Sequence, residues 1–112
     1  MKASEMKKGD MFLFIPQGVE REYMSTEIYV KMHDDTVNVQ GRDASSFIKN
    51  SALVKTLISN YEPTPRDIWS WTDKFFNELM ETNYIFPIKD LQEAEAICKE
   101  CGVDMPDDGL PE

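Results

Sequence analysis

Two cysteines near the end of the chain have a spacing that is typical of redox and metal-binding motifs. Cys98 and Cys101 form a C-x-x-C, which is typical of thiol–disulfide centres and of one half of many zinc sites. In redox proteins this motif lies at a helix N-terminus, where the helix dipole lowers the thiol pKa. Here Gly102 follows directly, and a glycine in that place is typical of a helix C-terminus. We interpret both cysteines as buried structural residues, with half of a metal site and a thiol redox protein as alternatives.

The remaining chemical residues form no recognisable centre. The single histidine, His33, precedes Asp34 and Asp35, and a carboxylate can orient an imidazole for general base catalysis. The sequence positions no Ser or Cys nucleophile beside it. The pairs Asp34-Asp35 and Asp107-Asp108 lack the alternating ligand spacing of an EF-hand loop, and the chain has no P-loop and no G-x-G-x-x-G. We therefore predict no enzyme, no catalytic residue, no metal site and no cofactor.

Acidic side chains are the stronger functional signal, because they are unevenly distributed. Residues 1–60 carry eight basic and eight acidic side chains, whereas residues 61–112 carry four basic and thirteen acidic ones, so the net charge of −9 belongs to the second part. This charge disfavours direct binding of nucleic acid and of anionic membranes. It favours association with a basic protein surface.

Some of these acids have local roles in the predicted helices, where Asp67, Asp90 and Glu93 serve as caps and dipole partners. The others are candidates for contact with a partner. Trp69 joins them, because it lies toward one edge of a predicted apolar arc and Trp is frequent at binding hot spots. The predicted interaction residues are Asp73, Glu78, Glu81, Glu95, Glu100 and Trp69.

The first part of the chain has the pattern of short strands. Apolar or alternating segments at 11–15, 27–32, 36–40 and 46–49 are separated by polar turns with Gly or Asp, as expected for β-structure. We predict that 27–32 and 36–40 pair as a hairpin. Residues 53–58 fit a fifth strand or a helical turn, and periodicity alone leaves both open.

The second part has the pattern of two helices. Thr64, Pro65 and Asp67 suit the N-terminus of a helix that extends through Glu81 with a wide apolar arc. Residues 84–88 contain a proline and predict a connector or an edge strand. Asp90 and Gly102 suit the two ends of a second helix. The predicted fold is α+β, a small antiparallel barrel-like sheet of four to five strands followed by two packed helices.

The opening segment Lys7-Lys8-Gly9-Asp10-Met11-Phe12, followed by a predicted hairpin and a closing Val-rich segment, resembles small SH3-like barrels over residues 5–58. The resemblance implies an antiparallel barrel for this part and carries no functional residues. We expect residues 1–112 to form a single domain, with a β half at 1–60, an acidic two-helix half at 64–102 and a flexible acidic tail at 103–112.

Four hypotheses about function follow from these patterns. The favoured one is a non-enzymatic regulatory module that binds a basic protein through its acidic helical surface; in composition the chain is similar to accessory or inhibitor proteins of phages and mobile elements. The second is an SH3-like module that binds a peptide or nucleic acid through its β half, using the basic residues Lys7, Lys8, Arg21, Lys31, Arg42, Lys49 and Lys55. The third is a DNA mimic, and the fourth is the thiol redox protein.

Location and membrane contact are further expectations. The apolar run at 11–15 is too short for the core of a signal peptide, no segment has the length of a transmembrane helix, and two cysteines make no disulfide framework. We expect a cytoplasmic protein with no membrane contact.

Overall fold

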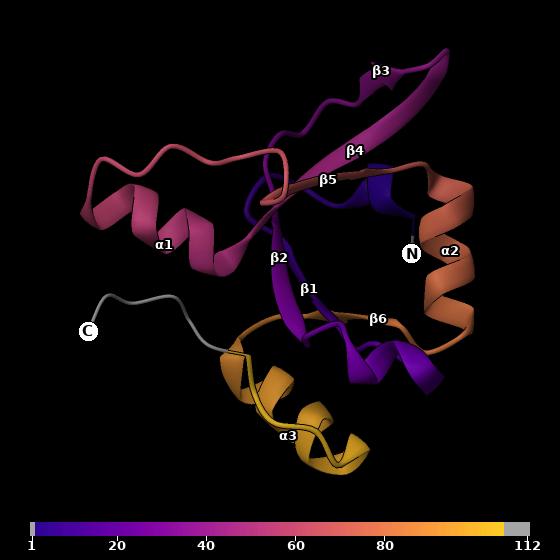
Figure 1. Cartoon of the computed structure of the whole chain (residues 1–112). Coiled ribbons are helices and arrows are strands. Elements are labelled where there is room, and N and C mark those ends of the chain that lie inside the picture. The colour runs from indigo at the N-terminus through magenta and orange to yellow at the C-terminus, as the bar shows by residue number, and fades with distance from the viewer. Residues whose placement is uncertain (1, 107–112) are drawn as a thin grey trace.

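The computed structural model describes residues 2–106, which form an antiparallel sheet of six strands with three α-helices around it (Figure 1). The strands are β1 (Met11–Phe14), β2 (Glu27–Lys31), β3 (Val37–Val39), β4 (Arg42–Lys49), β5 (Ile68–Trp71) and β6 (Ile85–Ile88). The helices are α1 (Asn50–Ile58), α2 (Asp73–Glu81) and α3 (Leu91–Cys101), with two short 3-10 helices, η1 (Ala3–Glu5) and η2 (Gly18–Glu22). The α+β class is as predicted.

The sheet is open. The strands follow the order β3-β4-β2-β1-β6, and β5 pairs with β4. Within residues 2–106 β6 pairs only with β1, so the strands do not close on themselves. The predicted barrel closure is therefore wrong, and so is the prediction of two helices, because α1 is a third helix within the predicted β half.

The predicted hairpin between 27–32 and 36–40 is also wrong. Both segments are strands, but each pairs with β4: β2 through Lys31 opposite Phe47, and β3 through Val37 opposite Ala44. The eight-residue β4 is long enough to bind both in succession, and β3 and β4 form the hairpin at the top of Figure 1. β4 includes the short strand predicted at 46–49 and begins earlier, at Arg42.

The helix predicted to begin at Thr64 is wrong in its first part. The carboxylate of Asp67 accepts a hydrogen bond from the Thr64 backbone N–H at 2.8 Å, as a capping box would predict, but the chain makes only a turn there. Ile68 to Trp71 then pair with β4 as β5, because this run of aromatic and β-branched side chains suits a strand and finds a partner edge. The helix α2 begins after Thr72, whose hydroxyl accepts from the Phe75 N–H at 3.3 Å.

Residues 53–58, for which the sequence left strand and helix open, belong to the helix α1.

The C-terminal elements are close to the prediction. β6 is an edge strand that tolerates Pro87. In α3 the Asp90 side chain accepts from the Glu93 N–H at 2.9 Å, and Gly102 has the left-handed φ of 71° that ends a helix.

Alternate residues of the strands contact different helices. Phe12 and Phe14 of β1 pack with Phe76 of α2, whereas Leu13 and the following Ile15 pack with the α3 residues Ala94 and Cys98. A third cluster joins Val30 and Ile48 to Ala52 of α1. Because successive side chains of a strand point to opposite faces, α2 and α3 lie against opposite faces of β1, and α1 covers the same side as α3. Figure 1 shows α2 at the right and α3 at the bottom.

Within the described residues, no helix combines the length and the hydrophobicity that crossing a bilayer requires. At the start of the predicted tail, Val103 packs beside α3. Residues 107–112, with the pair Asp107-Asp108, lie outside the part of the chain that the structure describes.

Candidate functional site

An apolar pocket of about 340 Å³ lies on the side of the sheet that α2 covers. We call it the aromatic pocket, because six of its lining residues have aromatic rings: Phe14, Tyr29, Trp69, Trp71, Phe75 and Tyr84. Met24, Leu79 and Glu20 complete the lining. Such concave, mostly apolar surfaces with a few polar groups are the usual form of a binding site.

The alternation of the strands positions the aromatic rings. Trp69 and Trp71 are two residues apart in β5 and therefore point to the same side of the sheet, where their rings stack with centroids 5.7 Å apart and planes at 19°. Tyr29 of β2 contacts Trp71 edge to face at 5.4 Å. Trp71 and Tyr29 are buried, whereas Trp69 is 42% exposed and Phe75 is 48% exposed. The exposed pair offers solvent-accessible ring surface beside a rigid aromatic floor.

Glu20 is the one charged residue in this lining. It comes from η2, is half-buried, and accepts a hydrogen bond from the Tyr84 hydroxyl at 3.4 Å. Burial and the negative charge of Glu20 raise the pKa of Tyr84, and burial also raises the pKa of Tyr29. Both phenols are therefore neutral at physiological pH, and the pocket has one carboxylate among neutral rings.

Trp69 is 42% exposed, and it lies on the strand β5 and not on the predicted helix. Glu78 and Glu81 are exposed on α2. Glu78 lines a second hollow together with Phe75 and Trp71, which also line the aromatic pocket. The exposed acids of α2 therefore adjoin the aromatic pocket through Glu78, and the basic side chains of Arg42 and Lys74 line the same hollow.

Asp73 has a structural role in the fold. Its two carboxylate oxygens accept hydrogen bonds from the Ser4 backbone N–H at 2.8 Å and from the Ser4 hydroxyl at 2.6 Å. Burial by itself would raise the pKa of Asp73, but these hydrogen bonds and the charges of Lys2 and Lys31 together hold it below its usual value of 3.8. This carboxylate fastens the N-terminal segment to the start of α2.

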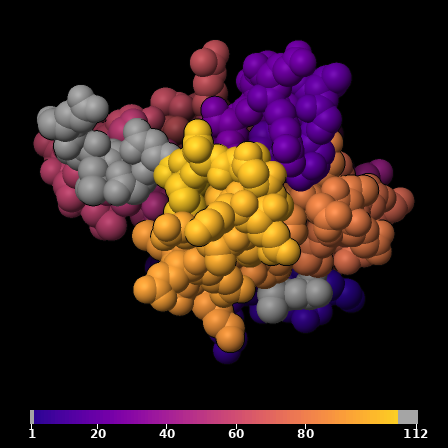
Figure 2. Space-filling view, turned by 90° about the horizontal axis from the view of Figure 1, so that it is seen from below, coloured from indigo at the N-terminus to yellow at the C-terminus, as the bar shows by residue number. Residues whose placement is uncertain are grey.

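The structure does not bring all the predicted acidic residues together. Glu95 and Glu100 are exposed on α3, which packs against the opposite face of β1 from α2. Figure 2 shows α3 in yellow at the centre of the face seen from below, with α2 in orange to its right. The acids belong to two separate helical surfaces, of which only that of α2 adjoins the aromatic pocket.

Lys31 cannot contribute to the basic patch that the second hypothesis predicted for the β half. This side chain is 1% exposed, and its ammonium group donates hydrogen bonds to the carbonyl oxygens of Ala3 at 2.8 Å and Met6 at 2.5 Å. Burial lowers the pKa of Lys31, although Asp34, Asp73 and Asp10 oppose the shift. Lys31 is therefore not available to an exposed basic patch, because η1 covers β2 at this position.

The cysteines lie at the C-terminal end of α3, as predicted. Both are free; Cys98 is buried and Cys101 is half-buried. Burial raises the pKa of Cys98, which is the opposite of what thiol redox chemistry requires. His33 is exposed. Across residues 2–106, no three His, Cys, Asp or Glu side chains are grouped so that they could hold a metal ion.

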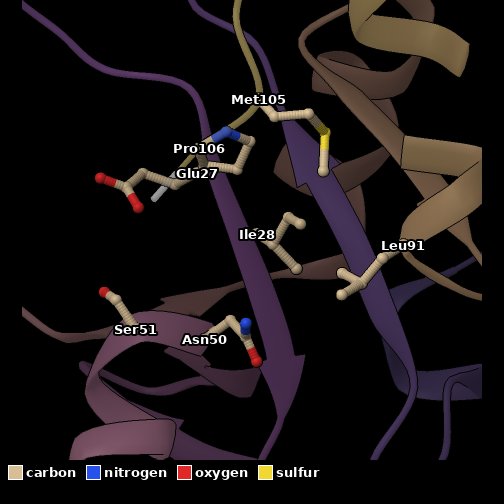
Figure 3. Close-up of a pocket in the computed structure, with 7 residues that line it drawn as sticks. All are labelled: Glu27, Ile28, Asn50, Ser51, Leu91, Met105 and Pro106. Carbon is tan, nitrogen blue, oxygen red and sulfur yellow. The ribbon is translucent and has the colours of Figure 1, made fainter. Parts of the chain in front are cut away.

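A different pocket, of about 310 Å³, lies between β2, α1 and the segment after α3 (Figure 3). Ile28, Leu91 and Met105 form its apolar side, and the oxygens of Glu27, Asn50 and Ser51 lie toward its other side. It has neither aromatic rings nor a positive group in its lining. The aromatic pocket is therefore the better candidate for specific recognition.

Trp69 is the one lining residue of the aromatic pocket that was among the predicted interaction residues; sequence reasoning missed the others. Nothing local in the sequence around Glu20 indicates that this residue lies beside Tyr84. The available signal was the spacing of Trp69 and Trp71, since two aromatic residues at i and i+2 share one face of a strand.

No protein-family model matches the chain, and no curated protein or solved structure shows significant similarity to it. The resemblance of residues 5–58 to SH3-like barrels therefore stays a prediction.

Proposed function

We propose that this protein is a non-enzymatic binding module that recognises a basic protein through the aromatic pocket and the acidic side of α2. One observation carries the proposal: Phe75, whose half-exposed ring lines the aromatic pocket with Trp69, also lines the neighbouring hollow that contains the exposed acid Glu78. Binding hot spots combine aromatic anchors of this kind with a polar rim. Glu81 extends the same helix surface.

The net charge supports a basic partner. Exposed carboxylates steer oppositely charged proteins into contact and raise the association rate. Among the described residues of α2 itself, Glu78 and Glu81 have one lysine, Lys74, so the helix is acidic on balance, although Arg42 of β4 lines the same hollow as Glu78. Glu95 and Glu100 form the matched surface for comparison, because α3 has similar charge but no adjoining aromatic pocket.

A site-specific photo-crosslinker tests the proposal in cells that naturally produce the protein. A benzoylphenylalanine in place of Phe75 is expected to capture a basic protein, whereas the same group in place of Leu57, which is 75% exposed on α1, is not. With the captured partner purified, Glu78→Lys with Glu81→Lys should weaken binding about tenfold or more, and added salt should weaken it steadily, because exposed charges are screened.

The double variant Glu95→Lys with Glu100→Lys is the control for a general effect of charge. It should change the affinity much less than the α2 variant does. An equal loss in both variants, or an affinity that does not depend on salt, would contradict recognition through α2.

A further inference from the structure

We propose that the aromatic pocket holds the guanidinium group of an arginine side chain from the partner, with Glu20 as its counter-ion. This inference rests on the proposed function and adds the chemistry of the group that the pocket recognises. Three features of the described residues lead to it: the ring faces, the position of the carboxylate, and the hydrogen bonds that already hold Arg21, the basic residue next to Glu20 in the sequence.

The ring faces favour a cation over an anion. An aromatic face carries partial negative charge and attracts a cation placed within about 6 Å of its centre, most strongly in the case of Trp. The pocket has two Trp rings stacked 5.7 Å apart, of which Trp69 is 42% exposed. Phe75 adds a second half-exposed ring to the lining.

The carboxylate of Glu20 gives the pocket a negative charge at a fixed place. A half-buried charge is costly unless it is paired, and the hydrogen bond from the neutral Tyr84 hydroxyl is long, at 3.4 Å. A carboxylate offers several acceptor positions, so this bond leaves room for a charged donor. A purely apolar side chain in the pocket would remove water from Glu20 without replacing its hydrogen bonds.

The adjacent basic residue does not supply that donor. Arg21 follows Glu20 in η2, but its guanidinium donates to the Pro16 carbonyl oxygen at 2.8 Å and to the Gln17 side chain at 3.2 Å. Arg21 is thus held by the turn before η2. Arg21 therefore leaves the Glu20 carboxylate available to a cation from a partner.

Arginine fits these features better than lysine does. Its guanidinium is planar, stacks on aromatic faces and is more weakly hydrated than an ammonium, so it loses less on entering an aromatic site. Its several N–H groups can bind a carboxylate through two of them. A volume of about 340 Å³ lies near the lower limit of small-ligand pockets, which suits a single side chain.

The test is a titration of the chain of residues 1–112 with three small probes that differ in the end of the side chain: N-acetyl-arginine methylamide, N-acetyl-lysine methylamide and N-acetyl-norleucine methylamide. Binding is followed by NMR from the indole N–H signals of Trp69 and Trp71. We expect the arginine probe to shift both signals in a saturable way, the lysine probe to bind more weakly, and the norleucine probe to have no saturable effect.

The Glu20→Gln variant should bind the arginine probe about tenfold more weakly, as expected for loss of a partly desolvated charge partner. Glu22→Gln is the matched control, because Glu22 is exposed in the same 3-10 helix and does not line the pocket. Unchanged indole signals without probe show that Glu20→Gln leaves the pocket folded. If the indole signals of that variant show that its pocket is altered, the comparison of the three probes on the unsubstituted protein still decides whether the pocket prefers a guanidinium group.

Two results would overturn the inference: norleucine binding as well as arginine, which indicates a hydrophobic anchor site, or equal arginine binding by the Glu20→Gln and Glu22→Gln variants. These results are separate from a failure of the proposed function. If crosslinking at position 75 captures a basic partner while the arginine probe fails, the protein is a binding module whose pocket takes another group.

Discussion

Asp73 and Lys31 are charged side chains that hold the N-terminal segment against the sheet. Lys31 donates to two carbonyl oxygens at η1, and Asp73 accepts from two groups of Ser4. Each belongs to a different element, and both contact residues near the start of the chain. The sequence pattern predicted that both side chains are exposed to solvent. Their partners near the start of the chain are far away in the sequence, so no local pattern indicates these contacts.

Replacing Asp73 by Ala should lower the free energy of unfolding by about 1–2 kcal/mol at neutral pH, since two hydrogen bonds to a charged acceptor are lost. The folded-state pKa of Asp73 is depressed, so its contribution is present above the unfolded pKa and disappears as the pH falls through the folded pKa. The stability difference between the two proteins should therefore shrink below about pH 4.

Urea unfolding at several pH values measures this difference. Glu78→Ala is the control, because Glu78 is exposed on the same helix. A constant difference from pH 7 to pH 2 would contradict the role assigned to the Asp73 carboxylate.

At the scale of elements, a helix-start signal and a strand-pairing signal compete in the segment from Thr64 to Glu81. Thr64 and Asp67 form the hydrogen bonds of a helix start, yet the following residues enter the sheet as β5. The Asp67 carbonyl oxygen accepts from the Lys49 N–H at 2.8 Å, at the end of β4. Pairing with β4 along four residues outweighs the local tendency to continue as a helix.

Thr72→Ala should destabilise the protein by about 1 kcal/mol, because Thr72 is the N-cap of α2. Thr64→Ala should cost clearly less, because its hydroxyl makes one exposed hydrogen bond at 3.1 Å in a turn. Thermal unfolding followed by circular dichroism compares the two variants. A larger loss for Thr64→Ala would indicate that the helix begins at Thr64, against the structure.

At the scale of the whole molecule, one aromatic cluster connects the sheet to α2. Phe12 is fully buried and its ring contacts four others at 4.9 to 5.3 Å. These rings come from β2, β4, β5 and α2: Tyr29, Phe47, Trp71 and Phe76. The aromatic pocket shares Tyr29 and Trp71 with this cluster, so the floor of the pocket is part of the core.

Phe12→Ala should therefore destabilise the protein by about 3–5 kcal/mol and broaden the indole NMR signal of Trp71. Leu57→Ala, at an exposed position of α1, should change stability by less than about 0.5 kcal/mol. Urea unfolding measures both. Equal stability of the two variants would contradict the placement of Phe12 at the centre of the cluster.

The sequence by itself determined the features that depend on neighbouring residues. These include the α+β class, the strands near 11–15 and 27–32, and α3 with its Asp90 and Gly102 ends. Strand alternation, caps and left-handed glycines act over a few residues, so their signals are visible in the chain itself.

Only the tertiary structure decided which strands pair and which charges meet. β2 and β3 both pair with β4, β5 replaces a helical turn, and the acids of α2 and α3 are divided between opposite faces of β1. The aromatic pocket joins Phe14, Glu20 and Trp69 from three distant parts of the chain. Such contacts depend on the competition among all possible partners for burial and hydrogen bonds, which no local pattern records.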